Sequence, residues 1–319
     1  LKMLDELIVH IGRHKSGTSS LQHFLASRQG ELDQLGYLYP FSGRANRIAH
    51  HALADACDPK KSDDSAPTRI IQELQIELQP HHHAVLLSSE AFQNVTDLHR
   101  LSRVADALGA RKIRIICYVR EHLDYAISGY RQMVQNQPRF MTFGAYARRL
   151  KELTGFIERW QAFGDLTLKW YDRAELKDGD IIVDFCELLD FEPGKISSED
   201  RNPSIGGNLL IYKLALNRLG MAGPGYNTLR HLAAIHPRFR AAFYVSKKDA
   251  NTLRQESAYN EYLFTLLGPI QLRSWCGGEV LPDFDTLEID LDRIDPNLNS
   301  QDRTRIINEV ETSCDWLKL

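Results

Sequence analysis

The fold is decided near the start of the chain by Leu7-Ile8-Val9-His10-Ile11-Gly12-Arg13-His14-Lys15-Ser16-Gly17-Thr18-Ser19-Ser20-Leu21, which predicts a strand, a loop and a helix in succession. Residues 7–11 form an apolar run of strand length. Apolar side chains then recur at positions 21, 24 and 25, the spacing of one face of a helix. The segment therefore predicts a strand that turns through a short loop into a helix beginning near Thr18.

The loop between this strand and this helix suits a phosphate-sized anion. Its small residues let backbone N–H groups face an anion, Lys15 adds a positive charge, and the helix contributes its N-terminal dipole. The order is G-x-x-K-x-G-T-S, with Lys15 before Gly17, whereas a Walker loop places the lysine after the second glycine. Because Gly and Ser also serve as plain helix caps, a turn without a ligand is the alternative for this segment alone.

The composition of the chain is that of an ordinary globular protein. Its 319 residues are 43% hydrophobic and 25% charged, with a formal net charge of −3. This mild acidity counts against a general nucleic-acid binder, which needs many phosphate contacts. No apolar run approaches the roughly 20 residues that span a bilayer, and the start of the sequence lacks a signal-peptide pattern. We expect neither a membrane span nor a nucleic-acid partner.

The cysteines indicate a reducing compartment. There are five, widely scattered and never in C-x-x-C spacing. Reduced thiols in a cytosolic protein are therefore expected, rather than a disulfide framework or a zinc site.

Strand and helix patterns alternate through the first two thirds of the chain. Beyond residues 7–11, strands are expected at residues 84–87, 112–119 and 166–171, with a short extended piece at 36–40. Helices are expected between them, at residues 50–56, 70–78, 97–108, 121–130, 142–153, 155–163 and 180–189. This alternation predicts an α/β fold with a mostly parallel sheet covered by helices on both faces.

The pattern changes to helices from about residue 208. Helices are expected at residues 209–219, 229–243, 250–267 and 301–317, with an acidic, turn-rich stretch at 282–299. We therefore expect an α/β core over residues 1–207 and a mostly helical region over 208–319 that packs on the core and contributes to an acceptor site.

Candidate chemical groups lie at the ends of predicted strands and in a polar loop. Glu90 follows the strand at 84–87, and open α/β sheets place ligands at the carboxyl ends of their strands, so Glu90 is a candidate proton acceptor. His51 lies in the polar region after Pro40 and is a second candidate base, with a plain surface histidine as the alternative. The run at 81–83 holds three histidines whose side chains diverge, which indicates a solvated lead-in to the strand rather than a metal site.

A second anion pattern follows the strand at 112–119. Arg120 stands at its exit, and Ser128 lies two helical turns further on. The arginine and the serine hydroxyl can hold one anion between them. The alternative is an arginine paired with a nearby carboxylate.

Together these pieces resemble the sulfotransferases that use 3'-phosphoadenosine 5'-phosphosulfate (PAPS). The loop at residues 12–20 looks like the family's 5'-phosphosulfate loop, in which the lysine also precedes the second glycine. Arg120 and Ser128, eight residues apart, look like the 3'-phosphate motif, and residues 168–189 resemble the strand and helix that follow it. The motifs stand in the family's order and leave the helical C-terminal region uncovered.

The resemblance implies a three-layer P-loop fold and an enzyme that moves a sulfuryl group from PAPS to an acceptor hydroxyl or amine, with a carbohydrate among the candidate acceptors. Lys15 would neutralise charge on the bridging oxygen as the S–O bond breaks, and no metal would be needed. Glu90, ranked first, or His51 would accept the proton of the acceptor, and Phe92 or the acceptor would desolvate Glu90. The donor-binding residues so implied are Arg13, His14, Lys15, Ser16, Gly17, Thr18, Ser19, Arg120, Ser128 and Tyr171.

Some roles stay open at this point. Either Tyr171 or Trp170 would lie near the adenine. The family's C-terminal G-x-x-G-x-x-K loop has no copy here, and residues 201–207 are the only stand-in. Basic residues near position 235 would suit an anionic acceptor, although a solvated helix face is the favoured interpretation.

Two other functions compete with sulfuryl transfer. One is a P-loop nucleotide kinase or NTPase, although the strand at 112–119 ends in Arg120 rather than in an acidic metal ligand. The other is a non-catalytic nucleotide-binding module. The lack of a membrane anchor favours a soluble, cytoplasmic, bacterial-type enzyme over a Golgi enzyme. The sequence specifies neither the acceptor nor the oligomeric state.

Overall fold

The protein is described from a computed structural model that covers residues 3–150, 155–194, 203–240, 247–255, 257–270 and 284–312. The chain divides into two compact units, and each is described by itself. Unit 1 comprises Leu1–Arg120 and Leu153–Ile196, and unit 2 comprises Glu121–Glu152 and Ser197–Leu319.

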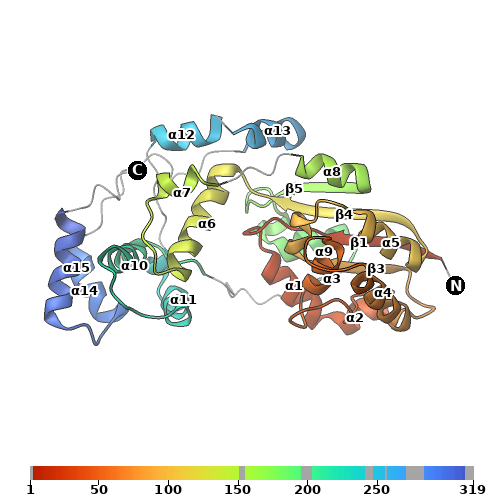
Figure 1. Cartoon of the computed structure of the whole chain (residues 1–319), viewed down its shortest axis with the longest axis horizontal. Coiled ribbons are helices and arrows are strands. Elements are labelled where there is room, and N and C mark those ends of the chain that lie inside the picture. Colours follow the sequence, from red (N-terminus) through yellow and green to blue (C-terminus); the bar gives the residue numbers. More distant parts are fainter. Residues whose placement is uncertain are drawn as a thin grey trace. The chain divides into compact units, whose positions relative to one another are not determined.

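The described part of unit 1 is built on a five-stranded parallel sheet with the strand order β2-β3-β1-β4-β5. Strands β1, β3, β4 and β5 are labelled in Figure 1. The strands are β1 (Leu4–His10), β2 (Tyr37–Leu38), β3 (Ala84–Ser88), β4 (Ala110–Val119) and β5 (Asp165–Trp170). The central strand β1 pairs in parallel with β3 and β4, and His10 lies opposite Ser88 and Ile116. β3 is buried along its whole length and almost continuously apolar, and the apolar run Leu7–Val9 of β1 is buried too, as expected for strands covered on both faces.

Helices cover both faces of this sheet. On one face, Ile8, Leu86 and Ile116 share a core with α1 (Thr18–Ser27) and α9 (Ile181–Leu188). On the other face Leu7 and Val9 are also fully buried. There α5 (His99–Leu108) contacts β4, and α3 (His51–Cys57) and α4 (Ser65–Glu77) pack with α5. The remaining helices of unit 1 are α2 (Gln29–Gln34), η1 (Glu90–Asn94), α8 (Phe156–Phe163) and η2 (Lys177–Gly179). The predicted α/β class, with helices on both faces of a parallel sheet, is confirmed.

Unit 2 is helical throughout its described residues. Its helices are α6 (His122–Asn136), α7 (Phe143–Ala147), α10 (Gly207–Leu219), α11 (Tyr226–Ile235), η3 (Pro237–Arg240), α12 (Lys247–Gln255), α13 (Ala258–Leu267), α14 (Phe284–Ile294) and α15 (Ser300–Thr312). The central helix is α10, which is buried from Asn208 to Asn217 and contacts α6, α14, α15 and η3. An α-helix that is apolar on every side needs such a shell of neighbours.

The compact units do not follow the predicted boundary at residue 207. Residues 121–152 belong to unit 2, because apolar residues of α6 such as Leu123 and Val134 share a core with α10. The sequence order gives no sign of this, since α6 follows directly on a strand of the sheet.

Several predicted helix bounds in unit 2 are wrong. The helix expected at 229–243 ends at Ile235, since Pro237 cannot continue it. The helix expected at 250–267 is two helices, and the hydroxyl of Ser257 caps the second by accepting the N–H of Asn260. The helix expected at 142–153 is only α7 in its described part, and residues 151–153 lie outside the described residues.

The acidic stretch expected to be turn-rich contains α14. Leu287, Leu291 and Ile294 recur there at helical spacing and are buried in the core of unit 2. The many acidic residues hid this apolar stripe. One of them, Asp290, is itself buried and is paired with Arg238 at 2.5 Å.

Two further expectations concern the whole chain. Within the described residues, no helix combines the length and apolar character required to cross a membrane.

Cys57, Cys117 and Cys186 are buried free thiols, as expected, and Cys276 and Cys314 lie outside the described residues.

Candidate active site

The loop after β1 is a tight turn that positions Lys15. Lys15 and Gly17 both have left-handed backbone angles, with φ of 69° and 74°. Ser16 donates both its backbone N–H, at 3.2 Å, and its hydroxyl to the carbonyl of Arg13. Arg13 is almost fully buried, while Lys15 is half-buried. The turn is therefore closed by its own hydrogen bonds and leaves the lysine with solvent access.

Helix α1 begins directly at this turn. Its N-cap is Gly17, and no side chain caps the first turn. The first N–H groups of a helix have no partner within the helix, and the positive end of the helix dipole favours an anion there. Gly12 also lets the chain pass close to this helix, because a Cβ at that position would lie 2.1 Å from Cγ2 of Thr18 and would displace that side chain. Thr18 is buried and Ser19 is half-buried at this helix start, next to Lys15.

Tyr171 and Arg120 lie together beside the loop. A Cβ on Gly17 would lie 2.5 Å from Cε2 of Tyr171, so the ring packs against the glycine. The guanidinium carbon of Arg120 lies 4.6 Å from the centroid of the same ring, in a cation–π contact. The N–H of Tyr171 donates to the carbonyl of Val119 at 2.8 Å, which joins the ends of β5 and β4. Trp170, the other aromatic candidate, is buried at the end of β5.

Ser128 lies in α6, in unit 2, and is half-buried. Because Arg120 belongs to unit 1, the pairing of these two residues stays a prediction. The stand-in stretch 201–207 is also in unit 2, and its residues 201–202 lie outside the described part.

Glu90 and His51, the two candidate bases, are neighbours in unit 1. Glu90 begins η1 immediately after β3, and His51 is the first residue of α3. Nε2 of His51 lies 3.8 Å from Oε1 of Glu90, and the side chains are 27% and 19% exposed. The other carboxylate oxygen of Glu90 accepts a hydrogen bond from Nε2 of Gln22 on α1, at 2.8 Å. Gln22 thus joins the acid–base pair to the helix that starts at the anion loop.

Ser89 holds the other ring nitrogen of His51. Its Oγ lies 2.7 Å from Nδ1 of His51 and also accepts the N–H of Ala91, at 3.1 Å, as the N-cap of η1. Ser89 is fully buried. No sequence motif assigns a role to Ser89. The signal for it in the sequence is its place at the end of a buried strand, beside Glu90.

His14 shows that the loop and the acid–base pair share one electrostatic environment. Desolvation by surrounding atoms lowers the pKa of the His14 imidazole, although the residue keeps solvent access. The carboxylate of Glu90 opposes this shift, while His51, Arg13 and Lys15 add to it. Phe92, expected to desolvate Glu90, lies in the core with its ring centroid 6.4 Å from that of Trp160.

Two further histidines behind the site are structural. His10 is fully buried, its Nδ1 lies 2.8 Å from Oγ of Ser88, and burial lowers its pKa to about 4. Nδ1 of His50 accepts the N–H of Ser88 at 3.0 Å, and Nε2 lies 3.0 Å from the carbonyl of Pro40. Burial lowers the pKa of His50 to about 3. Both rings are therefore neutral near pH 7.

The prediction of a solvated histidine run at 81–83 is wrong for His82. Its side chain is 1% exposed, and Nε2 lies 2.7 Å from Oδ1 of Asp33. His81 also approaches Asp33, so these three groups have the separation of metal ligands. However, Nδ1 of His82 accepts the N–H of Gln79, which places the ring proton on Nε2. The arrangement is a hydrogen bond to Asp33, and the lone pair that a metal would need is absent from Nε2.

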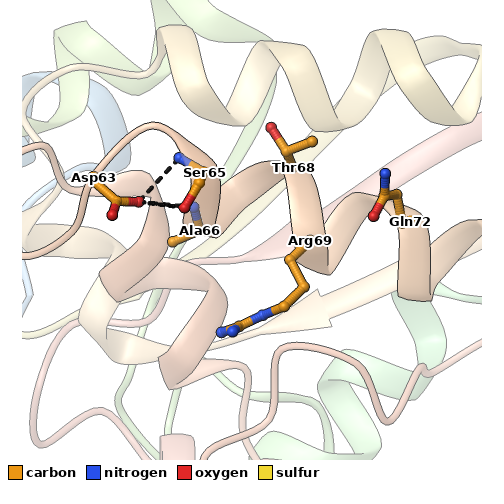
Figure 2. Close-up of a pocket in the computed structure, with 6 residues that line it drawn as sticks. All are labelled: Asp63, Ser65, Ala66, Thr68, Arg69 and Gln72. Atoms are coloured by element: carbon orange, nitrogen blue, oxygen red, sulfur yellow. Dashed lines mark hydrogen bonds between the residues drawn. The ribbon is translucent and has the colours of Figure 1, made fainter.

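Two surface hollows of the described part contain none of the predicted site residues. One, of about 460 Å³, lies at the start of α4, where Asp63 accepts hydrogen bonds from the N–H and hydroxyl of Ser65 (Figure 2). The other, of about 370 Å³, lies between α1, α2 and β2 and is lined by Tyr37, Tyr39 and Phe41 among others.

Comparisons with known proteins assign no family. No family model matches the chain, and no solved structure matches it. A protein of Archaeoglobus fulgidus described as uncharacterized is 27% identical over 126 residues, which is 38% of this chain and 34% of that protein. The chain therefore matches about one third of the length of that relative.

Proposed function

We propose that this protein is a PAPS-dependent sulfotransferase that transfers a sulfuryl group to an acceptor hydroxyl or amine. The observation that carries the proposal is the convergence, within unit 1, of the turn at Lys15 and the His51–Glu90 pair, joined through Gln22. Group transfer from an anionic donor needs a site that stabilises charge on the leaving oxygen and a base for the proton of the acceptor. This edge of the sheet offers both kinds of group.

The residues of the loop fit a phosphosulfate group. The first turn of α1 has no side-chain cap that would compete with an anion, and the left-handed Gly17 permits the sharp entry into the helix. In this proposal the N–H groups of residues 16–19 and the hydroxyls of Thr18 and Ser19 bind the anion. Arg120 binds the 3'-phosphate, and Tyr171, which contacts both Gly17 and Arg120, lies near the adenine.

In this proposal the sulfuryl transfer itself needs no metal ion. A bond forms between the acceptor oxygen or nitrogen and sulfur, and the bond between sulfur and the bridging oxygen breaks. Lys15 neutralises the negative charge left on that oxygen, and the His51–Glu90 pair takes the proton of the acceptor. Adenosine 3',5'-bisphosphate and the sulfated acceptor are the products.

Thermal unfolding with adenosine 3',5'-bisphosphate tests the donor site. A ligand at a hundred times its Kd stabilises the folded state by about 2.7 kcal/mol, so a clear rise in Tm is expected. No rise at saturating concentration would overturn the proposal. A larger rise with Mg-ATP would favour the kinase or NTPase alternative.

A screen with labelled PAPS would then identify the acceptor. Saccharides, phenols and peptides would each be incubated with the full chain, and label transfer would be measured. Bisphosphate binding without transfer to any acceptor would support a non-catalytic binding module instead.

A further inference from the structure

Ser89, His51 and Glu90 form a half-buried contact whose hydrogen bonds also bear on the protonation of the His51 ring. The two ring nitrogens of His51 face different groups, Oγ of Ser89 at 2.7 Å and Oε1 of Glu90 at 3.8 Å. A neutral imidazole has one N–H donor and one acceptor nitrogen. The role of His51 therefore depends on which nitrogen carries the proton.

The hydrogen bonds of Ser89 decide this point. A serine hydroxyl donates one hydrogen bond, and a fully buried one needs a protein acceptor for that proton. The N–H of Ala91 is a donor, so it uses a lone pair of Oγ and not the proton. Within the described residues, Nδ1 of His51 is the acceptor that remains for the Ser89 hydroxyl.

We infer that Ser89 holds His51 as a hydrogen-bond donor, with its proton on Nε2, and that Glu90 rather than His51 is therefore the proton acceptor of the site. Nε2–H of His51 faces the carboxylate of Glu90 and has no lone pair with which to take a proton. Oε2 of Glu90 is held by Gln22, which leaves Oε1 for the acceptor's proton. Ser89 and His51 are positioning residues, and this assignment of roles rests on the proposed sulfuryl transfer.

The location of the proton can be measured without any activity. Protein labelled with ¹⁵N-histidine would be examined by two-dimensional NMR at about pH 8, above the ordinary pKa of histidine, with His51→Gln used to assign the ring. The expected spectrum shows a proton on Nε2 and none on Nδ1. A proton on Nδ1, in a neutral or a doubly protonated ring, would overturn the inference.

Kinetics of two matched variants test the roles. Glutamine at position 51 places an N–H donor near the position of Nε2 but cannot take a proton, so His51→Gln should lose less than about 10-fold in kcat. Glu90→Gln keeps the shape of the carboxylate but removes the base, so it should lose about 100-fold or more. The reverse order would overturn the assignment.

Bisphosphate-induced stabilisation is the control for both variants, because neither change touches the anion loop. If the wild-type chain sulfated no acceptor but the spectrum showed Nε2–H, the proposed function and its roles would fail while the tautomer assignment would stand.

Discussion

Two consecutive serines at the carboxyl end of β3 contact histidines, and the surroundings of the two serines differ in their access to solvent. Ser88 forms the buried contact. Its hydroxyl meets Nδ1 of His10, and its N–H donates to Nδ1 of His50. Ser89 forms the half-buried contact with His51, beside Glu90. Successive strand residues point to opposite sides, which places the two serines in different surroundings. The same pair of residue types thus supports the fold in one case and is available for chemistry in the other.

The largest expected effect concerns the chemistry beside the half-buried contact. Lys15→Ala should lower kcat by about 100- to 1000-fold, because it removes the charge that stabilises the leaving oxygen. Lys61→Ala is the matched control, since Lys61 pairs with Asp55 at the surface, where both side chains are about half exposed. Initial-rate measurements with PAPS check this, and turnover unchanged in Lys15→Ala would refute the role assigned to the lysine.

The second largest expected effect is a difference in stability between variants of the adjacent residues His50 and His51. His50→Ala should lower the free energy of unfolding by about 3 kcal/mol, since it opens a cavity and leaves the N–H of Ser88 unpaired. His51→Ala should lower it less, by about 1 to 2 kcal/mol, because the side chain is 27% exposed and the main loss is the acceptor of the Ser89 hydroxyl. Urea unfolding of both variants measures the difference, and equal losses would abolish the distinction between the two contacts.

The buried contact should also make stability depend on pH. The pKa values of His10 and His50 are about 4 and about 3 in the folded state, below the ordinary 6.5 of the unfolded chain. Between pH 6.5 and 4 the unfolded state therefore binds more protons, so lowering the pH destabilises the fold, by about 1.4 kcal/mol per pH unit for each histidine.

Urea unfolding between pH 6.5 and 4.5 measures this effect together with those of His14, whose lowered pKa acts in the same direction, and Glu121, whose raised pKa acts in the opposite direction. Asp33, whose carboxyl pKa is lowered by its hydrogen bond from His82, contributes only below its ordinary 3.8. His50→Gln should reduce the slope, because one of the two buried histidines no longer takes up a proton only on unfolding. A wild-type free energy of unfolding that stays flat over this range would contradict the burial of neutral imidazoles.

The smallest expected effect is the loss of one hydroxyl from each contact. Ser88→Ala should lower the free energy of unfolding by about 1 to 2 kcal/mol, since a buried nitrogen of His10 loses its partner. Ser89→Ala should lower it by about 1 kcal/mol through loss of the η1 cap, and it alone should change the His51 NMR signals. A change at His51 in Ser88→Ala instead would show that the two contacts are not independent.

Local patterns made much of the fold predictable. The apolar runs of β1, β3 and β4 are buried on both faces, so their sequences mark the sheet directly. The glycines and Lys15 of the first loop likewise marked a tight turn into a helix. The sequence could not show that residues 121–152 pack in unit 2, because that depends on contacts with α10, far along the chain.

The candidate site was only partly predictable. Its place at a strand end made Glu90 a candidate, and His51 was a candidate only as one of two adjacent histidines in a polar loop. Their proximity depends on tertiary packing between α3 and η1, which are separated by a helix and a strand in the sequence. The burial of His82 was missed for the same reason. Its sequence neighbours show no pattern that separates a structural histidine from an exposed one.

The three buried thiols offer a built-in reporter of unfolding. Cys57 on α3, Cys117 on β4 and Cys186 on α9 sample both helical layers and the sheet of unit 1, and burial raises the pKa of each to about 12. A thiol reacts as its thiolate, so these three should resist alkylation while the fold is closed. Alkylation rates at each position, read by peptide mass spectrometry, would therefore report how often each layer opens in the native protein.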